Sequence, residues 1–193
     1  MKRNMKKIAS VLLVAMLALC LTACGGGKDN NAGTVEIADA AEILTTVWGA
    51  YEEDEMFPVG GGDSENMSME GPAKFDVSKA EELEALLNFP AASADKIDDA
   101  ASMMHMMNAN TFTAGAYHVA DAADMSAVVD AIKDKVMNNH WMCGFPETLI
   151  IVQVSDSYVV SAYGNGELID TFQTKLLAAY EGAAEVVVEG SLM

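Results

Sequence analysis

The order of apolar patterns in the second half of the chain constrains its fold more than any other feature. From Thr111 onward, strand-like runs alternate with runs that have the apolar spacing of helices, in the order strand, helix, strand, strand, helix, strand. The strands are expected at 111–119, 148–154, 158–163 and 185–189, and the helices at 121–136 and 167–181. This is the split β-α-β order, which predicts a small sheet with its helices on one face.

Three more helices are expected ahead of this unit. Asp39 and Glu42 have the spacing of a capping box, as do Ser78 and Glu81, and a third helix is expected over 93–108. Between the first two, Met56–Asp76 holds Gly60-Gly61-Gly62 and has no periodicity, as in a functional or mobile loop. We therefore predict an α+β fold: a small, mostly antiparallel sheet with an added N-terminal helical layer.

The N-terminus has the features of a lipoprotein export signal. Basic residues at positions 2–7 precede Ile8–Leu21, a fourteen-residue run without charge that is shorter than the roughly 20 residues of a membrane span. Leu21, Thr22 and Ala23 then stand before Cys24, as in the cleavage motif of bacterial lipoproteins. We expect residues 1–23 to be the signal peptide, Cys24 to carry lipid, 24–37 to be a flexible tether, and 38–193 to be one extracytoplasmic domain.

These features together resemble a family of small lipoproteins from anaerobic Gram-positive bacteria, built on an extracytoplasmic domain of unknown function. The resemblance is carried by the cleavage motif, the acidic body, Met103-Met104 ahead of a short strand, and a valine-rich hairpin before a terminal helix. It covers roughly 38–180 and implies a location on the outer face of the cell membrane. It implies no catalytic residues.

Charge narrows the partners that the domain can bind. Beyond residue 23 the chain carries 7 Lys, no Arg and all 29 acidic residues. Such a body repels nucleic acid and anionic membrane surfaces, because phosphate binding requires basic side chains. The membrane is therefore expected to be a partner only through the lipid on Cys24.

Familiar catalytic motifs are missing from the sequence. There is no His-Glu-x-x-His and no Gly-x-Ser-x-Gly, and Gly60-Gly61-Gly62 is not followed by the Lys-Ser or Lys-Thr of a phosphate loop. We therefore predict a non-enzymatic binding or interaction module without a cofactor, whose partner is an extracytoplasmic protein or a small molecule.

Two unusual strings carry the candidate site residues. In a helix, the string from Met103 to Met107 would place Met104 and Met107 in the core and leave His105 and Met106 exposed. One interpretation of the string from Asn139 to Pro146 is that its large side chains pack under the end of the sheet. Cys143 is then expected to be buried and unreactive between Trp141 and Phe145. The other interpretation is a partner or ligand surface made by His140, Trp141 and Phe145.

The alternative function is soft-metal handling of the copper type. Thioether, thiol and imidazole groups are ligands that Cu(I) prefers. The side chains that could supply them are Met103, His105, Met106, His140, Met142 and Cys143.

Overall fold

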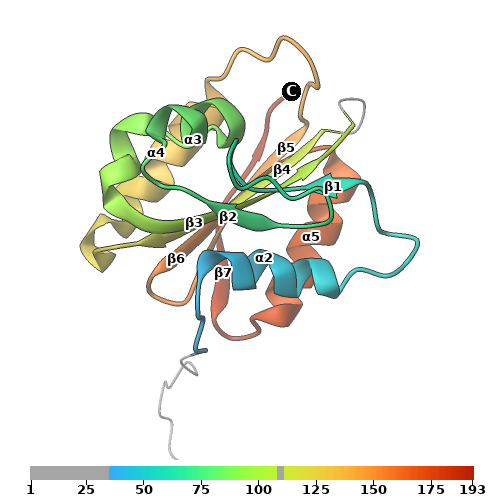
Figure 1. The fold of residues 1–193 in the computed structure, drawn as a ribbon, viewed down its shortest axis with the longest axis horizontal. Helices are drawn as coiled ribbons and strands as arrows, with labels where there is room; N and C mark the ends of the chain where they lie inside the picture. The colour runs from blue at the N-terminus through green and yellow to red at the C-terminus, as the bar shows by residue number, and fades with distance from the viewer. Residues whose placement is uncertain (1–34, 108–110) are drawn as a thin grey trace, which may run out of the picture. The chain divides into compact units, whose positions relative to one another are not determined.

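A sheet of seven antiparallel strands lies at the centre of the structure (Figure 1). The computed structural model describes residues 35–107 and 111–193. The strands along the sheet follow the order β1-β3-β4-β6-β5-β7, and β2 pairs with the same edge of β3 as β1 does. Their bounds are β1 Val59–Gly60, β2 Ala73–Phe75, β3 Ile97–His105, β4 Phe112–Val119, β5 Thr148–Val154, β6 Tyr158–Gly164 and β7 Ala184–Ser191. The predicted α+β class is confirmed.

Helices cover both faces of this sheet. One face packs against α2 (Ala40–Gly49) and α5 (Gly166–Ala179), and the other packs against α3 (Ala80–Leu87), the 3-10 turn η1 (Ala91–Lys96) and α4 (Met125–Met137) (Figure 1). Residues of β5 alternate between the two cores: Ile150 and Val152 face α5, whereas Leu149 and Ile151 face α4. This is why β5 reads as a continuous apolar run.

The expectation that the helices share one face is wrong, and the sheet order explains why. The chain crosses from β4 through α4 to β5, and from β6 through α5 to β7; each crossing joins parallel strands with one antiparallel strand between them. Both crossings move in the same direction across the sheet. Their starting strands, β4 and β6, run antiparallel to each other. Because such crossovers are right-handed, their helices must lie on opposite faces.

Local capping signals set the start of α2 and the end of α3. Asp39 accepts a hydrogen bond from the backbone N–H of Glu42 at 2.9 Å, as the capping box predicts, whereas the Glu42 carboxylate accepts its bond from Ala38, one residue before the N-cap, at 2.7 Å. The α3 helix instead begins after Lys79 without a side-chain cap, since Ser78 bonds to Asp76. It ends at Asn88, whose φ of 51° is left-handed.

The predicted helix over 93–108 is wrong. Its first part is η1 and the remainder is β3, a nine-residue strand that pairs with β4 on one side and with β1 and β2 on the other. Met103 is therefore buried in the core beneath α2, while Met104 faces the opposite core and is only partly buried. Met107 lies beyond the strand and is exposed, contrary to expectation.

The glycine-rich stretch Met56–Asp76 is organised around one buried carboxylate. Asp63 accepts hydrogen bonds from the backbone N–H groups of Glu65 and Asp76 and forms an ion pair with Lys79 at 2.7 Å. The side chain of Asn66 donates a further hydrogen bond at 2.9 Å. Both β1 and β2 lie in this stretch, so the absence of periodicity reflects two very short strands joined by a hydrogen-bonded loop.

Candidate functional site

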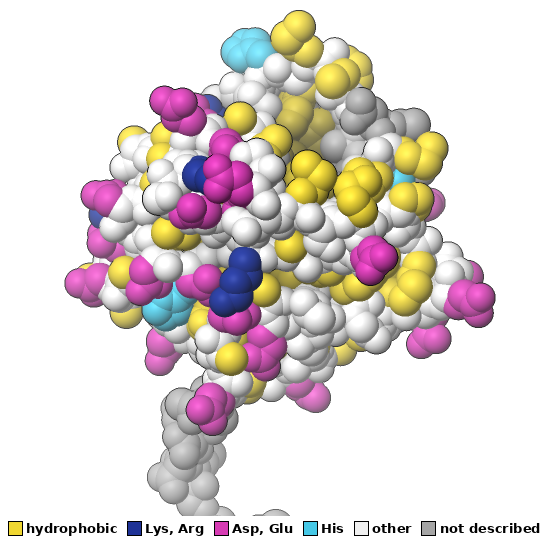
Figure 2. All heavy atoms as spheres, viewed as in Figure 1, with side chains coloured by type: hydrophobic (Ala, Val, Ile, Leu, Met, Phe, Trp, Pro, Cys, Tyr) yellow, Lys and Arg dark blue, Asp and Glu magenta, His cyan; other side chains and the backbone are white. Residues whose placement is uncertain are grey.

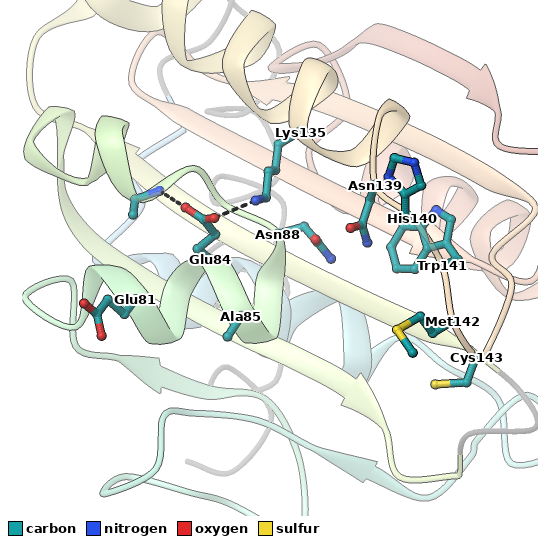
Figure 3. Close-up of a pocket in the computed structure, with 11 residues that line it drawn as sticks. Glu81, Glu84, Ala85, Asn88, Lys135, Asn139, His140, Trp141, Met142 and Cys143 are labelled. Carbon is teal, nitrogen blue, oxygen red and sulfur yellow. Dashed lines mark hydrogen bonds and ion pairs between the residues drawn. The ribbon is translucent and has the colours of Figure 1, made fainter.

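A groove of about 620 Å³ opens beside α3 on the α4 face of the sheet (Figure 3). One wall comes from α3 and η1, and the other comes from the end of α4 and the segment that leads to β5. Its lining consists of Glu81, Glu84, Ala85, Asn88, Ala91, Lys135, Asn139, His140, Trp141, Met142 and Cys143. Four of the five residues considered for metal binding or partner binding in the 140–145 segment therefore line a single concave surface: His140, Trp141, Met142 and Cys143; Phe145 is not among the lining residues.

An ion pair holds the two walls at one end of the groove. The carboxylate of Glu84 on α3 contacts Lys135 Nζ on α4 at 2.6 Å, and it accepts a hydrogen bond from the backbone N–H of Ala91 at 3.0 Å. Hydrogen bonding to Lys135 is the main cause that lowers the pKa of Glu84, so this side chain stays ionised at neutral pH. This end of the groove is therefore polar, and the ammonium group of Lys135 is already paired with Glu84.

The base of the groove is aromatic and tightly positioned. Asn88 donates a hydrogen bond to the hydroxyl of Tyr163 on β6 at 2.8 Å, and burial raises the pKa of that hydroxyl. The ring of Trp141 packs on Tyr163 with centroids 5.3 Å apart. The left-handed conformation of Asn88 ends α3 and aims its amide at Tyr163, so the helix end fixes the groove base.

Two large apolar side chains of the 139–145 segment are exposed. Met142, which lines the groove, is 93% exposed, and Phe145, which is not among the lining residues, is 70% exposed, whereas Trp141 is half-buried. Figure 2 shows hydrophobic side chains around a hollow in this region of the surface. Large apolar side chains at this level of exposure, next to a concave surface, are typical of binding sites.

The prediction that Cys143 is buried is wrong: its side chain is exposed. The segment connects the end of α4 to the start of β5; along it Pro146 is buried, and Asn139, Trp141 and Gly144 are partly buried. Gly144 has a φ of 74° and its carbonyl accepts a hydrogen bond from Thr111, which turns the chain outward at Cys143.

The groove contains the side-chain types that a hydrolase uses, but they are not connected. His140, Cys143 and Glu81 all line it. Figure 3 shows hydrogen bonds and ion pairs at Glu84 and none between His140 and Cys143. A nucleophile needs its base within hydrogen-bond reach, and this arrangement does not provide that contact.

The other predicted string, Met103 to Met107, lies at the β1 edge of the sheet and is split between its faces. Met103 is fully buried, and His105 stacks on Phe57 with ring centroids 4.7 Å apart and planes 9° apart. The Nδ1 atom of His105 accepts a hydrogen bond from the backbone N–H of Met107 at 2.9 Å, and burial lowers the pKa of this imidazole. The structure therefore does not bring Met103, His105 and Met106 together as one ligand set.

Sequence reasoning missed the groove residues contributed by other elements. Glu84, Asn88 and Lys135 belong to helices whose patterns look like ordinary solvated faces, and only the packing of α3 beside α4 brings them to the segment at 140. In the described part of the chain, no group of three or more His, Cys, Asp or Glu side chains is arranged to hold a metal ion.

The lipid-attachment motif, Leu21 to Cys24, lies outside the described residues. Among residues 35–107 and 111–193, no helix has both the length and the apolar character needed to cross a membrane. No protein-family model matches the chain, and no curated protein or solved structure is significantly similar to it.

Proposed function

We propose that this chain is a membrane-anchored extracytoplasmic lipoprotein whose folded domain binds a partner through the groove between α3, α4 and the 139–145 segment. The cleavage motif before Cys24, the basic start and the uncharged run support the anchor. The resemblance to small lipoproteins of anaerobic Gram-positive bacteria supports the same location. The groove supports binding as the role of the domain.

One observation carries the binding proposal: Met142 at the groove and Phe145 in the same segment, outside the lining, are both exposed, while Trp141 packs on Tyr163. Full burial of a side chain such as Phe145 contributes about 1.5–3 kcal/mol. Aromatic anchors beside a concave surface are the usual centres of protein interfaces. Burial of Met142 and Phe145 against a bound partner would therefore stabilise the complex.

The groove's chemistry indicates which groups a partner would bring. At the α3 wall, Glu81 and Glu84 supply carboxylates, and Lys135 is already paired with Glu84. The opposite wall presents the apolar side chains of Trp141 and Met142 together with the polar side chains of Asn139 and His140. A complementary partner is an extracytoplasmic protein or peptide that places an apolar side chain against Trp141 and a basic or hydrogen-bond-donating group toward α3.

Binding is the better-supported role than catalysis. Figure 3 marks no hydrogen bond between the groove's imidazole and thiol, and Glu84 and Lys135 are paired with one another rather than aimed at an open position. The apolar side chains of Trp141 and Met142 are instead suited to contact the surface of a partner.

The proposal is tested by partner capture from intact cells with the full-length chain. We expect the double variant Met142→Ala with Phe145→Ala to reduce capture at least ten-fold relative to the wild type, because it removes the two apolar side chains that would contact the partner. Both side chains are solvent-exposed, so the fold should tolerate their removal. Val187→Ala is the matched control, since Val187 is 40% exposed on β7, outside the groove lining.

Equal capture by the wild type and the double variant would overturn the groove as the binding surface. A partner identified in this way is then titrated against the purified full-length proteins. That measurement separates a direct contact from co-purification, because no third protein is present to bridge the two. A direct partner should also bind the control variant as tightly as the wild type.

A further inference from the structure

Exposed methionines gather at the β1 edge of the sheet, apart from the groove lining. Met67 is 65% exposed, Met69 61% and Met106 44%, and Met104 on β3 is partly buried beside them. Figure 2 shows hydrophobic side chains on the surface over β1 and the loop that follows it. A single exposed methionine is ordinary, but several side by side form an apolar patch that calls for an explanation.

Strand pairing places these side chains on one face. Gly60 of β1 is the direct partner of Met104. One residue further on, Gly61 and Ser68 exchange both backbone hydrogen bonds, at 3.0 and 2.8 Å, which sets Met69 opposite Gly60. Directly opposed residues point to the same side of a sheet, so Met69 and Met104 flank Gly60 on a common face.

Met106 and Met67 join the same face by alternation. Met106 is two residues from Met104 along the chain, and its backbone N–H bonds to the Pro58 carbonyl at 2.8 Å, which continues the β1 to β3 pairing. Met67 is two residues from Met69, across the paired Ser68. Residues two apart in extended chains share a face.

Gly60 leaves the space that a sulfur atom occupies. A Cβ atom built on Gly60 would stand only 2.6 Å from Met106 Sδ, so the Met106 sulfur lies directly over this glycine. Because Met69 and Met104 are the register neighbours of Gly60 on either side, three methionines border the position where no other side chain exists. Direct neighbours across a pair have Cβ atoms about 5 Å apart, well within the reach of flexible Met side chains.

We propose that Met67, Met69, Met104 and Met106 form a thioether site for Cu(I) or a similarly soft monovalent cation. Neutral thioethers select soft cations over Zn²⁺, Ca²⁺ or Mg²⁺. The strongly acidic body raises the local concentration of cations at its surface, although the ligands carry no charge themselves. A site of this kind contains no His, Cys, Asp or Glu ligand.

His105 is not part of this site. Its register partner is Val59, so its side chain lies on the face opposite Met104 and Met106, where it stacks on Phe57. The proposed ligands therefore share only Met106 with the set that the sequence pattern suggested.

Titration with Ag(I), a redox-inert substitute for Cu(I), tests the site. The full-length chain is used in detergent with all thiols blocked by N-ethylmaleimide, and its methionine methyl groups are observed by NMR. We expect saturation at one Ag(I) per chain, with shifts at the methyl groups of Met67, Met69, Met104 and Met106. Met69→Leu with Met106→Leu should weaken Ag(I) binding at least ten-fold.

Leucine substitutions separate metal binding from hydrophobic docking, because they keep the apolar surface and remove only sulfur. Met56→Leu with Met137→Leu is the matched control, since both methionines are exposed elsewhere. Unchanged affinity in the Met69/Met106 variant, or shifts that begin at Met142 or Met137, would overturn the site. The methyl shifts of the wild type decide the outcome even if a variant folds poorly. Loss of partner capture through the groove leaves this measurement unaffected.

Discussion

Single residues set the shape of the loop that follows β1. In Gly60-Gly61-Gly62, a Cβ atom on Gly61 would stand 2.3 Å from the backbone oxygen of Ser102, and Gly62 has a φ of 90°. The glycines therefore permit close passage of the chain over β3 and a left-handed turn, which are structural needs. These needs account for the glycines without a phosphate loop.

Asp63 is the residue on which this loop depends most. Burial raises the pKa of its carboxyl, but hydrogen bonds from Asn66, Lys79 and the backbone amides of Glu65 and Asp76 outweigh burial and hold the pKa well below its ordinary value. The carboxylate is thus stabilised as an anion in the folded protein, and the loop depends on its charge.

Asp63→Asn is expected to destabilise the protein by about 2 kcal/mol at pH 7, since it weakens several charge-assisted hydrogen bonds. The folded pKa lies below the unfolded value of about 3.9, so this contribution is fully present above about pH 5 and is lost as the pH falls through the folded pKa. Urea unfolding at pH 7 and at pH 3 measures the difference. Asp54→Asn, at an exposed acid, should show neither effect; a pH-independent penalty for Asp63→Asn would contradict the role of its charge.

At the scale of elements, β3 shows how pairing overrides a local pattern. The Ala and Met residues over 93–108 suit a helix, and the apolar spacing also fits one. In the folded chain, β3 gains hydrogen bonds to β4 on one side and to β1 and β2 on the other, which an isolated helix at the same position could not replace. The two-residue alternation is visible in Met103 and Met104, which face opposite cores.

An alanine scan across this segment distinguishes strand from helix. Met103→Ala should cost about 2–5 kcal/mol because it opens a cavity in a fully buried core position. Met106→Ala and Met107→Ala should each stay within about 0.5 kcal/mol, as exposed positions do. Free energies of unfolding from urea titration check the series; a larger penalty at Met107 than at Met103 would favour the helix.

At the scale of the whole molecule, the sheet order decides where the groove can form. Strand β3 occupies the edge of β4, so β7 adds beside β5, and the two crossover helices then lie on opposite faces. This leaves the α4 face open for α3, and the packing of α3 beside α4 creates the groove. A domain with both helices on one face would have no such wall.

The attachment of the molecule to the membrane is predicted to depend on one atom, the sulfur of Cys24. Cys24→Ala should abolish metabolic labelling with palmitate and release the protein from the membrane fraction, because only a thiol can form the thioether to lipid. Cys143→Ala, which leaves the cleavage motif intact, should keep both properties. Membrane retention of the Cys24→Ala variant would refute the lipoprotein hypothesis.

The sequence by itself determined the elements whose signals are local. The capping box at Asp39, the strands at β4, β5 and β6, and the amphipathic helices α4 and α5 were all predicted, because each rests on contacts between residues near in sequence or on a simple apolar period. The unusual composition of the 140–145 segment also marked one wall of the groove before its fold was known.

Only the tertiary structure decided what depends on residues far apart in the chain. The conversion of 97–105 into β3, the opposite faces of α4 and α5, the exposure of Cys143, and the meeting of Glu84 with Lys135 all follow from which strand pairs with which. Strand partners are chosen by burial and hydrogen bonding over the whole sheet, so no window of the sequence contains that choice. The same reason explains the methionines: their number is a property of the sequence, but only the pairing around Gly60 places four of them on one face.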